Sequence, residues 1–214
     1  MRKLLAIWLG KILTIVGKTV GKKSSSSPGA YALKICPDLV KGLEKCVSKG
    51  IIVTCGTNGK TTTNNLMASA LEAKGYKVIC NKLGANMLSG IATTVLQEMS
   101  IFGKLKADYA CLEIDEAYTP IVFDYVKPDV MVITNLFRDQ LDRYGEIDIT
   151  SDIIKRAIKK VPNLKLVLNG DDPLCVQFGR EENVKAYYYG ISEKVLPQLD
   201  DTKEGRFCPV CGEE

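Results

Sequence analysis

Six short apolar runs alternate with helix-like segments through most of this 214-residue chain. The runs cover residues 51–55, 76–80, 108–114, 129–134, 164–169 and 184–190, and the clearest helix-like segments cover 61–75, 85–99 and 149–160. Near-continuous apolar strands separated by helices are typical of a parallel sheet with helices on both faces. The alternation therefore predicts an α/β fold with a mostly parallel sheet. Such sheets bind ligands at the carboxyl ends of their strands, so functional motifs are expected directly after the apolar runs.

Composition and charge limit the classes of function. Hydrophobic residues make up 46% of the chain and charged residues 25%, as in an ordinary globular protein. Of the 29 lysines and arginines, six lie in residues 1–23, a segment without acids, so the rest of the chain has 23 basic and 25 acidic residues (29 − 6 = 23). Nucleic-acid-binding domains usually carry a basic stripe. The nearly balanced charge of the rest of the chain shows no such stripe, so no nucleic-acid partner is expected.

Six cysteines are scattered along the chain, and three of them lie within or at the ends of apolar runs. We expect small buried thiols of a reducing compartment rather than a disulfide framework, which predicts a cytoplasmic protein. These residues are Cys36, Cys46, Cys55, Cys80, Cys111 and Cys175.

Residues 1–23 combine basic and apolar residues. Wound as a helix, they place Lys3, Lys11 and Lys18 opposite one broad apolar face. That face consists of Leu4, Leu5, Trp8, Leu9, Ile12, Leu13, Ile15 and Val16. The pattern fits an interfacial helix at the anionic inner face of a membrane, and equally a helix whose apolar face packs on its own protein or on a partner. A cleaved signal peptide is disfavoured because Lys11 interrupts the apolar run. Residues 24–49 are interpreted as a linker, opening with SSSSPG, and a short helix.

The stretch GTNGKTT follows the first apolar run and precedes a helix-like segment, as a phosphate-binding loop does. Its glycines allow backbone N–H groups to turn toward an anion, and the following helix N-terminus points at the same place. Lys60 can reach the terminal phosphates, and the Thr61 hydroxyl can hold Mg²⁺. The usual first glycine is replaced by Thr54. The alternative is an ordinary strand–turn–helix junction. The predicted nucleotide-binding residues are Gly56, Thr57, Asn58, Gly59, Lys60, Thr61 and Thr62.

Acidic residues follow the third apolar run, in LEIDEAY. A carboxylate beside a phosphate-binding loop can complete the Mg²⁺ shell. Glu113 is the first acid after the apolar stretch and is the predicted metal ligand together with Thr61, and Asp115 and Glu116 are the next candidates. The alternative is a solvated acidic loop.

Polar residues also follow other apolar runs. Asn135, Asp139 and Gln140 belong to the stretch NLFRDQLDRYGE, and Asn86 belongs to NKLGANM; both stretches are candidates for contact with substrate or for support of the site. The alternatives are a helix start with internal ion pairs and a plain connection. In NGDDPL, Asp171 or Asp172 is interpreted as a helix cap before Pro173.

Taken together, GTNGKTT, LEIDEAY, TN followed by DQLDRYGE, and NGDDP resemble the central domain of the Mur ligase family. AIWLGK, NKLGANMLSGIATT and CPVCG are similar, within that family, to the MurT subfamily. Gln140 stands where Mur ligases commonly have a histidine near the metal, which puts its role as a metal neighbour in doubt. Mur ligases often carry a carbamylated lysine, and Lys155 lies in about the right helix without a definite register.

The resemblance implies ATP and Mg²⁺ as cofactors and a central ATP-binding domain over residues 50–200. It implies activation of the D-glutamate α-carboxyl of lipid II as an acyl phosphate, and amidation with ammonia from a glutaminase partner resembling GatD. Mur ligases carry their catalytic residues partly in a further C-terminal domain. The chain is therefore expected to be truncated and to bind nucleotide without completing turnover. The alternatives are another Mur-type amino-acid ligase and a nucleotide-binding module without that domain.

The tail, residues 201–214, contains Cys208 and Cys211 in the pattern C-x-x-C-G of a zinc knuckle. The MurT resemblance implies a second cysteine pair further on that closes a zinc ribbon. Two thiolates are therefore expected to form half of a structural Zn²⁺ site. A redox C-x-x-C is the main alternative, but such motifs usually open a helix after a strand.

Overall fold

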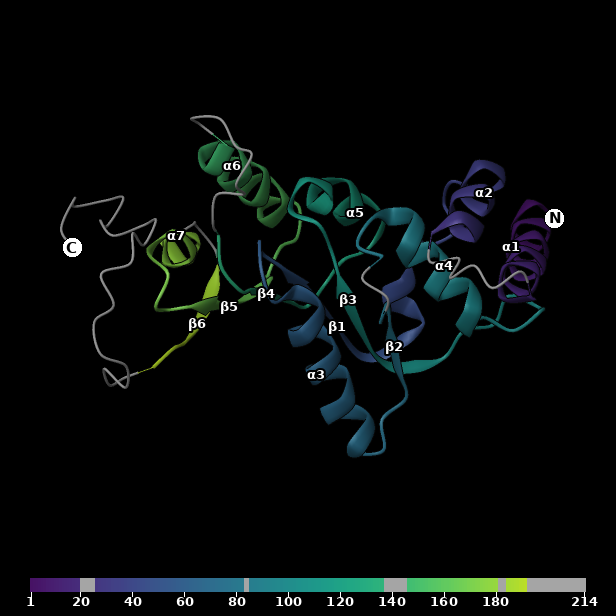
Figure 1. The fold of residues 1–214 in the computed structure, drawn as a ribbon, viewed down its shortest axis with the longest axis horizontal. Coiled ribbons are helices and arrows are strands. Elements are labelled where there is room, and N and C mark those ends of the chain that lie inside the picture. The colour runs from purple at the N-terminus through teal and green to yellow at the C-terminus, as the bar shows by residue number, and fades with distance from the viewer. Residues whose placement is uncertain (20–25, 83–84, 137–145, 181–183, 192–214) are drawn as a thin grey trace.

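The computed structural model describes residues 1–19, 26–82, 85–136, 146–180 and 184–191, and a single parallel sheet runs through its middle (Figure 1). The six strands stand in the order β2-β3-β1-β4-β5-β6, and every neighbouring pair is parallel. The strands are β1 Val47–Cys55, β2 Val78–Cys80, β3 Ala107–Glu113, β4 Val130–Ile133, β5 Lys165–Asn169 and β6 Lys185–Tyr189. The predicted α/β class is confirmed.

Helices cover both faces of the sheet because the direction of the crossovers reverses after β2. With right-handed crossovers, the helix between β1 and β2 lies on one face, and the helices of the later crossovers lie on the other. Figure 1 shows α3 on the opposite side of the sheet from α5 and α6. The helices are α1 Arg2–Thr19, α2 Ser27–Ile35, α3 Lys60–Ala73, α4 Leu88–Glu98, α5 Thr119–Tyr125, α6 Glu146–Lys159 and α7 Pro173–Val176, and 3-10 turns occur at Leu43–Lys45, Glu116–Tyr118 and Gln177–Arg180.

The core surrounds β1, which lies between β3 and β4. Ile51 and Val53 are fully buried, because helices cover both sides of this strand. Phe123 of α5 and Phe178 of the last 3-10 turn are among the largest fully buried side chains. Strands β1, β3 and β4 thus end inside the packed centre of the molecule, which fixes the position of the loops that follow them.

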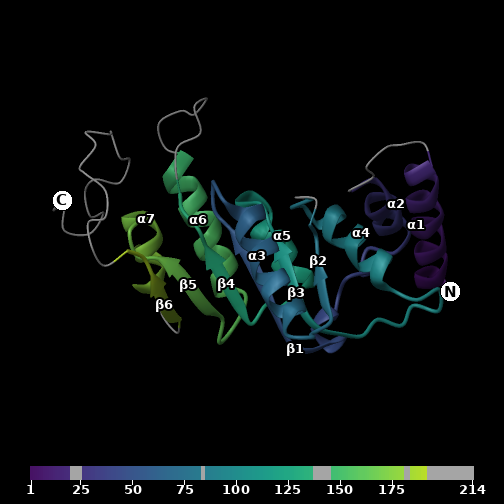
Figure 2. The same ribbon diagram turned by 60° about the horizontal axis from the view of Figure 1, so that its bottom comes forward.

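The N-terminal helices α1 and α2 pack on α4 at one end of the molecule (Figures 1 and 2). Gly29 of α2 makes the close approach possible, since an added Cβ would lie 2.0 Å from the Ser89 carbonyl oxygen. The Gly29 amide also donates to the Thr93 hydroxyl at 2.9 Å. Helix α1 contributes Ala6 and Ile7 to the core. Among the described residues, no helix is long and apolar enough to cross a membrane.

The side of α1 that packs is not the broad apolar face identified in the sequence. Ala6, Ile7, Gly10 and Thr14 are buried, whereas most of the large apolar residues remain exposed. Small residues on the packed side let the helices approach closely, and Gly10 lies directly against Leu96 of α4. Among the described residues, the large apolar face of α1 therefore does not pack on the chain itself.

Other element boundaries differ from the prediction for local reasons. The first strand begins four residues early, at Val47, and pairs with β3 through an irregularity between Val47 and Gly50. The SSSSPG segment ends within α2, because Ser27 begins that helix and Pro28 occupies its first turn, where proline is tolerated. Helix α5 was not predicted, since its seven residues are too few to show a helical period.

Candidate functional site

The loop between β1 and α3 has the open backbone that an anion site requires. Gly56 has φ of +124°, and an added Cβ there would lie 2.3 Å from the Thr134 hydroxyl oxygen. Gly59 has φ of +78°, stands immediately before α3 and has nothing within 4 Å of an added Cβ. Helix α3 begins at Lys60, and its first turn contains no acidic residue. Its amide dipoles therefore meet an open, unobstructed turn, which favours a phosphate.

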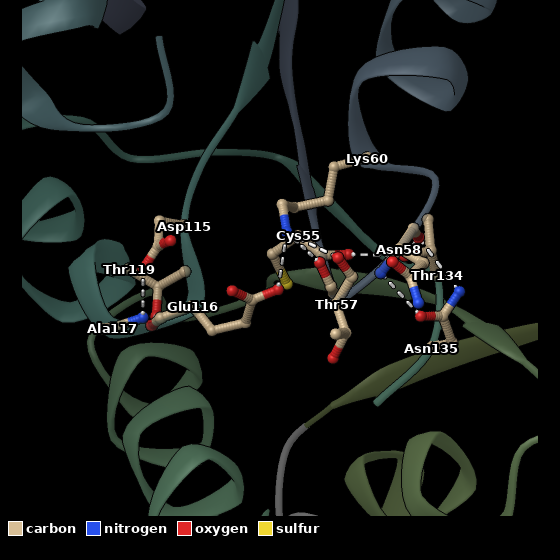
Figure 3. Close-up of polar contacts among 11 residues, drawn as sticks. Cys55, Thr57, Asn58, Lys60, Asp115, Glu116, Ala117, Thr119, Thr134 and Asn135 are labelled. Carbon is tan, nitrogen blue, oxygen red and sulfur yellow. Dashed lines mark hydrogen bonds and ion pairs between the residues drawn. The ribbon is translucent and has the colours of Figure 1, made fainter. Parts of the chain in front are cut away.

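Residues after β4 hold this loop in place (Figure 3). The Thr57 amide donates to the Asn135 carbonyl oxygen at 2.8 Å, and the Asn58 amide donates to the Asn135 side-chain oxygen at 2.8 Å. The Thr134 hydroxyl donates to the Asn58 carbonyl oxygen at 2.7 Å. Asn135 therefore supports the loop, and Thr134 is a supporting residue that the sequence reasoning missed. Its sequence signals were a hydroxyl at the end of an apolar run and its place in the TN pair of the family pattern.

The buried carboxylate of Asp172 holds in place the segment after β4 that supports the loop. The Asp172 carboxylate accepts from the Leu136 amide at 2.9 Å through one oxygen and from the Leu174 amide at 2.9 Å through the other. It thus caps α7, as one of the two predicted caps, and also fixes the chain just after Asn135. The neighbouring Asn169 side chain donates to the Thr134 carbonyl oxygen at 3.0 Å.

Lys60 is turned back onto the loop and pairs with Glu116. Its ammonium donates to the Thr57 carbonyl oxygen at 3.0 Å, also to that of Gly56, and lies 3.3 Å from a Glu116 carboxylate oxygen. Both side chains are mostly buried, with 15% and 14% exposed. Burial raises the pKa of Glu116, and the charge of Lys60 offsets part of that effect. The lysine predicted to bind phosphate is therefore held at the loop by Glu116, one of the further candidates for the metal ligand.

Glu113, the predicted metal ligand, ends β3 beside β1. It pairs in register with Thr54 and is 3% exposed. Its Oε2 atom is buried and has no hydrogen-bond partner among the described residues, and neither has the buried Thr54 hydroxyl. Buried polar oxygens are normally satisfied, and a carboxylate left unsatisfied is costly. A hard divalent cation would satisfy such an oxygen, so Glu113 fits the Mg²⁺ ligand predicted from the sequence.

The end of β3 is fixed by Asn81, which the sequence reasoning did not single out. The Asn81 side chain donates to the Glu113 carbonyl oxygen and accepts from the Glu113 amide, each at 2.8 Å. Asn81 thus continues the sheet where β2 has ended. Nearby, the carbonyl oxygen of Asn86 accepts from the Asp115 amide at 3.0 Å, which brings the segment with Asn86 to the same strand end.

The remaining predicted residues fall into two groups. Thr61 and Thr62 lie in the first turn of α3 and are exposed, so the Thr61 hydroxyl is accessible to a ligand at the loop. Asp139, Gln140, Cys208 and Cys211 lie outside the described residues. Within the described ranges, no three Asp, Glu, Cys or His side chains are grouped closely enough to hold a metal ion by themselves. A Mg²⁺ ion at Glu113 and Thr61 would therefore need oxygens from a nucleotide or water.

Cys55 lies at the base of the loop but is not a nucleophile. Its side chain is fully buried, and desolvation raises the thiol pKa well above its ordinary value, with Glu116 adding to the effect. The thiolate form, which is the reactive one, is therefore scarce at neutral pH. The described part of the site offers backbone amides for anion binding, the Lys60 ammonium and the mostly buried carboxylates of Glu113 and Glu116, a set suited to binding a nucleotide and neutralising its phosphates.

Comparison with known proteins agrees with this geometry. The model of the Mur ligase middle domain matches residues 53–208, from within β1 onward. The chain belongs to the Mur ligase family.

Relatives within the family are similar over nearly the whole chain. The chain is 37% identical over 212 residues to lipid II isoglutaminyl synthase (glutamine-hydrolyzing) subunit MurT of Staphylococcus aureus strain COL, covering 99% of this chain and 47% of that protein. It is 39% identical over 189 residues to the subunit of the same name from Streptococcus pneumoniae strain R6, covering 88% and 41%. The chain thus spans less than half the length of each relative, and the resemblance to MurT is confirmed.

Solved structures of Mur-type ligases share the fold. A pseudomurein peptide ligase type C from Methanothermus fervidus superposes with a TM-score of 0.59 at 29% identity, over 78% of this chain and 32% of that one. MurF ligase from Thermotoga maritima in complex with ADP superposes with a TM-score of 0.58 at 19% identity, over 74% and 36%. In both cases the chain corresponds to about a third of the ligase.

Proposed function

We propose that this chain is the nucleotide-binding part of an ATP-dependent carbon–nitrogen ligase of peptidoglycan synthesis, acting in the cytoplasm. The observation that carries the proposal is the loop of residues 56–62, whose open glycine backbone faces the first turn of α3. The family supports it, because a solved Mur ligase of this fold was captured with ADP.

Each residue of the site has a task in binding ATP. The amides of the loop and of the first turn of α3 would surround the phosphates, and Lys60 would move from Glu116 to a phosphate oxygen. Thr61 and Glu113 would hold Mg²⁺, which neutralises the phosphates when bound. Thr134, Asn135 and Asp172 keep the loop in shape, so that little reorganisation accompanies binding.

The reaction that we propose follows the name of the relatives, lipid II isoglutaminyl synthase. An oxygen of the D-glutamate α-carboxylate of lipid II attacks the γ-phosphorus of ATP, and the bond to ADP breaks. Ammonia from a glutaminase subunit resembling GatD then attacks the carbonyl carbon of the acyl phosphate, phosphate leaves with the electron pair of its bond, and loss of a proton yields D-isoglutamine. The identities of 37% and 39% to MurT chains favour this reaction over amino-acid addition.

The synthase activity is tested with the full-length gene product that contains these residues. It is incubated with ATP, Mg²⁺, lipid II and ammonium chloride, which replaces the glutaminase, and mass spectrometry follows the stem peptide. Conversion of a carboxyl to an amide supports the proposal. A parallel incubation replaces ammonium chloride with a mixture of amino acids; attachment of an amino acid there, without amidation by ammonia, would identify another Mur-type ligase. Nucleotide binding without change in lipid II in either incubation would identify a nucleotide-binding module.

The zinc half-site at Cys208 and Cys211 stays a prediction. It rests on the C-x-x-C-G pattern and on the MurT resemblance. If the full-length product folds a zinc ribbon, metal analysis should find about one zinc per chain, since four ligands close a structural site. Cys208→Ser should then remove most of it, because site closure and metal affinity are coupled.

A further inference from the structure

The outward side of helix α1 is apolar along its whole length, the reverse of an ordinary surface helix. The exposed fraction is 37% for Leu4, 54% for Leu5, 48% for Trp8, 57% for Ile12, 62% for Ile15 and 50% for Val16. On a helical wheel these six residues span one continuous arc, opposite the buried Ile7 and Gly10. None of the described residues covers this arc.

A second segment extends the apolar surface. The turn between α4 and β3 exposes Ile101 at 56% and Phe102 at 73%. The Trp8 indole N–H donates to the Ile101 carbonyl oxygen at 2.9 Å, and Gly103 lies against Ile7 and Leu4, so the turn sits beside the first half of α1. Two segments more than 90 residues apart thus expose large apolar side chains side by side. We call the six helix residues together with Ile101 and Phe102 the α1 patch.

Basic side chains lie near the α1 patch. Arg2 is exposed at the start of α1, and Lys104 and Lys106 are exposed just after Phe102. Residues 1–23 contain no acid, and neither does the stretch from 99 to 107. We propose that the α1 patch lies on the surface of an anionic lipid bilayer, with its apolar side chains in the headgroup region and these basic side chains at the lipid phosphates. An apolar arc bordered by lysine and arginine is the composition of helices that bind such surfaces.

Two other occupants fit less well. The rest of a longer chain would follow β6, which lies at the end of the molecule opposite α1 (Figure 2). A second copy of the chain would bring the basic residues of the two patches together, and like charges at an interface are unfavourable. A bilayer with anionic headgroups satisfies both the apolar arc and the basic border.

Binding to a bilayer does not depend on the proposed ligase reaction, although it would suit an enzyme with a lipid-linked substrate. The patch is formed by α1 and the turn at 101–102, whereas the nucleotide loop lies at the carboxyl end of β1 in the centre of the sheet. Vesicle binding and nucleotide binding are therefore measured separately, and the failure of one leaves the other intact.

The single tryptophan of the chain, Trp8, is a direct probe because it lies within the patch. The 214-residue chain is titrated with vesicles of phosphatidylcholine alone or mixed with phosphatidylglycerol, and tryptophan emission is recorded. We expect a blue shift and quenching by brominated lipids with the anionic vesicles, and weaker binding to the neutral ones. No shift at any concentration of anionic lipid would overturn the proposal. A shift that grows with protein concentration without lipid would overturn it in favour of a second copy.

Variants distinguish lipid binding through the α1 patch from non-specific binding of the protein to lipid. Phe102→Glu should weaken vesicle partitioning about tenfold or more, since an apolar side chain no longer leaves water. Replacing Arg2 by glutamine should weaken it about fivefold. Leu66→Glu is the matched control, because Leu66 is 69% exposed on α3 and should leave partitioning unchanged. Unchanged nucleotide affinity in Phe102→Glu shows that the variant is folded. Equal losses for Leu66→Glu and Phe102→Glu, or no loss for Phe102→Glu, would contradict the proposed surface.

Discussion

The ammonium of Lys60 lies 3.3 Å from a carboxylate oxygen of Glu116, and both side chains are mostly buried. The same ammonium also contacts the carbonyl oxygens of Gly56 and Thr57. The loop thus satisfies its own lysine with three oxygens. A phosphate that enters must replace these contacts, and the anionic Glu116 opposes its approach.

Glu116→Gln should therefore strengthen nucleotide binding. The variant weakens the competing contact of Lys60 and removes a negative charge near the phosphates. We expect ADP affinity without Mg²⁺ to rise about fivefold, which corresponds to about 1 kcal/mol. Titration calorimetry measures it. A loss of affinity would show instead that Glu116 contributes to the bound state.

The same variant should change the pH dependence of stability. The pKa of Glu116 is raised in the folded protein, chiefly by burial, so the folded state disfavours its charged form. Glutamate at this position therefore costs stability at neutral pH, and that cost disappears as pH falls below the ordinary glutamate value of about 4.3. Glu116→Gln should unfold at a higher temperature than the wild type at pH 7, and at about the same temperature near pH 4. A constant difference across this window would contradict the assignment.

Glu113→Gln should separate metal binding from folding. The buried Oε2 of Glu113 has no partner in the described part of the chain, so removing the charge should stabilise the metal-free protein by about 1 kcal/mol, or ~2–4 °C in melting temperature. The same change should abolish most of the increase in ATP affinity that Mg²⁺ causes. Differential scanning fluorimetry with a chelator and calorimetry with and without Mg²⁺ measure the two effects.

Asp115→Asn is the control for that experiment, since Asp115 is at the same strand end and was the next candidate ligand. It should retain the effect of Mg²⁺ on ATP affinity. Loss of the effect in Asp115→Asn but not in Glu113→Gln would move the metal ligand to Asp115. Equal losses of affinity with and without Mg²⁺ in Glu113→Gln would indicate a structural role only.

The fold and the loop were predictable because both follow from local patterns. Apolar runs that alternate with helices define a parallel sheet, and the positions of Gly56 and Gly59 match backbone conformations that the turn requires. The order of the strands did not follow from the residues, because it depends on which strand β1 pairs with across long separations. The sequence also did not show which acid pairs with Lys60, because Glu113, Asp115 and Glu116 all lie at the end of one strand.

The N-terminal helix shows what an apolar pattern leaves open. The eight-residue face seen in the sequence predicted either a membrane surface or packing through that face. The structure packs the helix through Ala6, Ile7 and Gly10 instead, because small residues allow the close approach to α4. The packed side combines Gly10, which allows the close approach, with the large apolar Ile7, which fills the core, and a single sequence does not show which neighbour a helix will meet.

Thr134→Val should test whether the residues after β4 hold the loop. The variant removes the hydroxyl that donates to the Asn58 carbonyl oxygen at 2.7 Å. We expect a loss of about 1–2 kcal/mol in the free energy of unfolding, measured with urea, together with weaker ADP binding. Thr94→Val is the matched control, because the Thr94 hydroxyl bonds back to the Gly90 carbonyl oxygen within its own helix, α4. Equal losses in the two variants would mean that the contact to Asn58 has no special role.

Nucleotide binding at the loop is the central claim, and Lys60→Ala tests it most directly. Calorimetry compares ATP·Mg²⁺ binding to the wild type, to Lys60→Ala and to Lys74→Ala, an exposed lysine just after α3. Removing a charge-assisted contact to phosphate should cost about 2–3 kcal/mol of binding free energy in Lys60→Ala, and Lys74→Ala should match the wild type. Unchanged ATP·Mg²⁺ affinity in Lys60→Ala would show that this loop is not the nucleotide site.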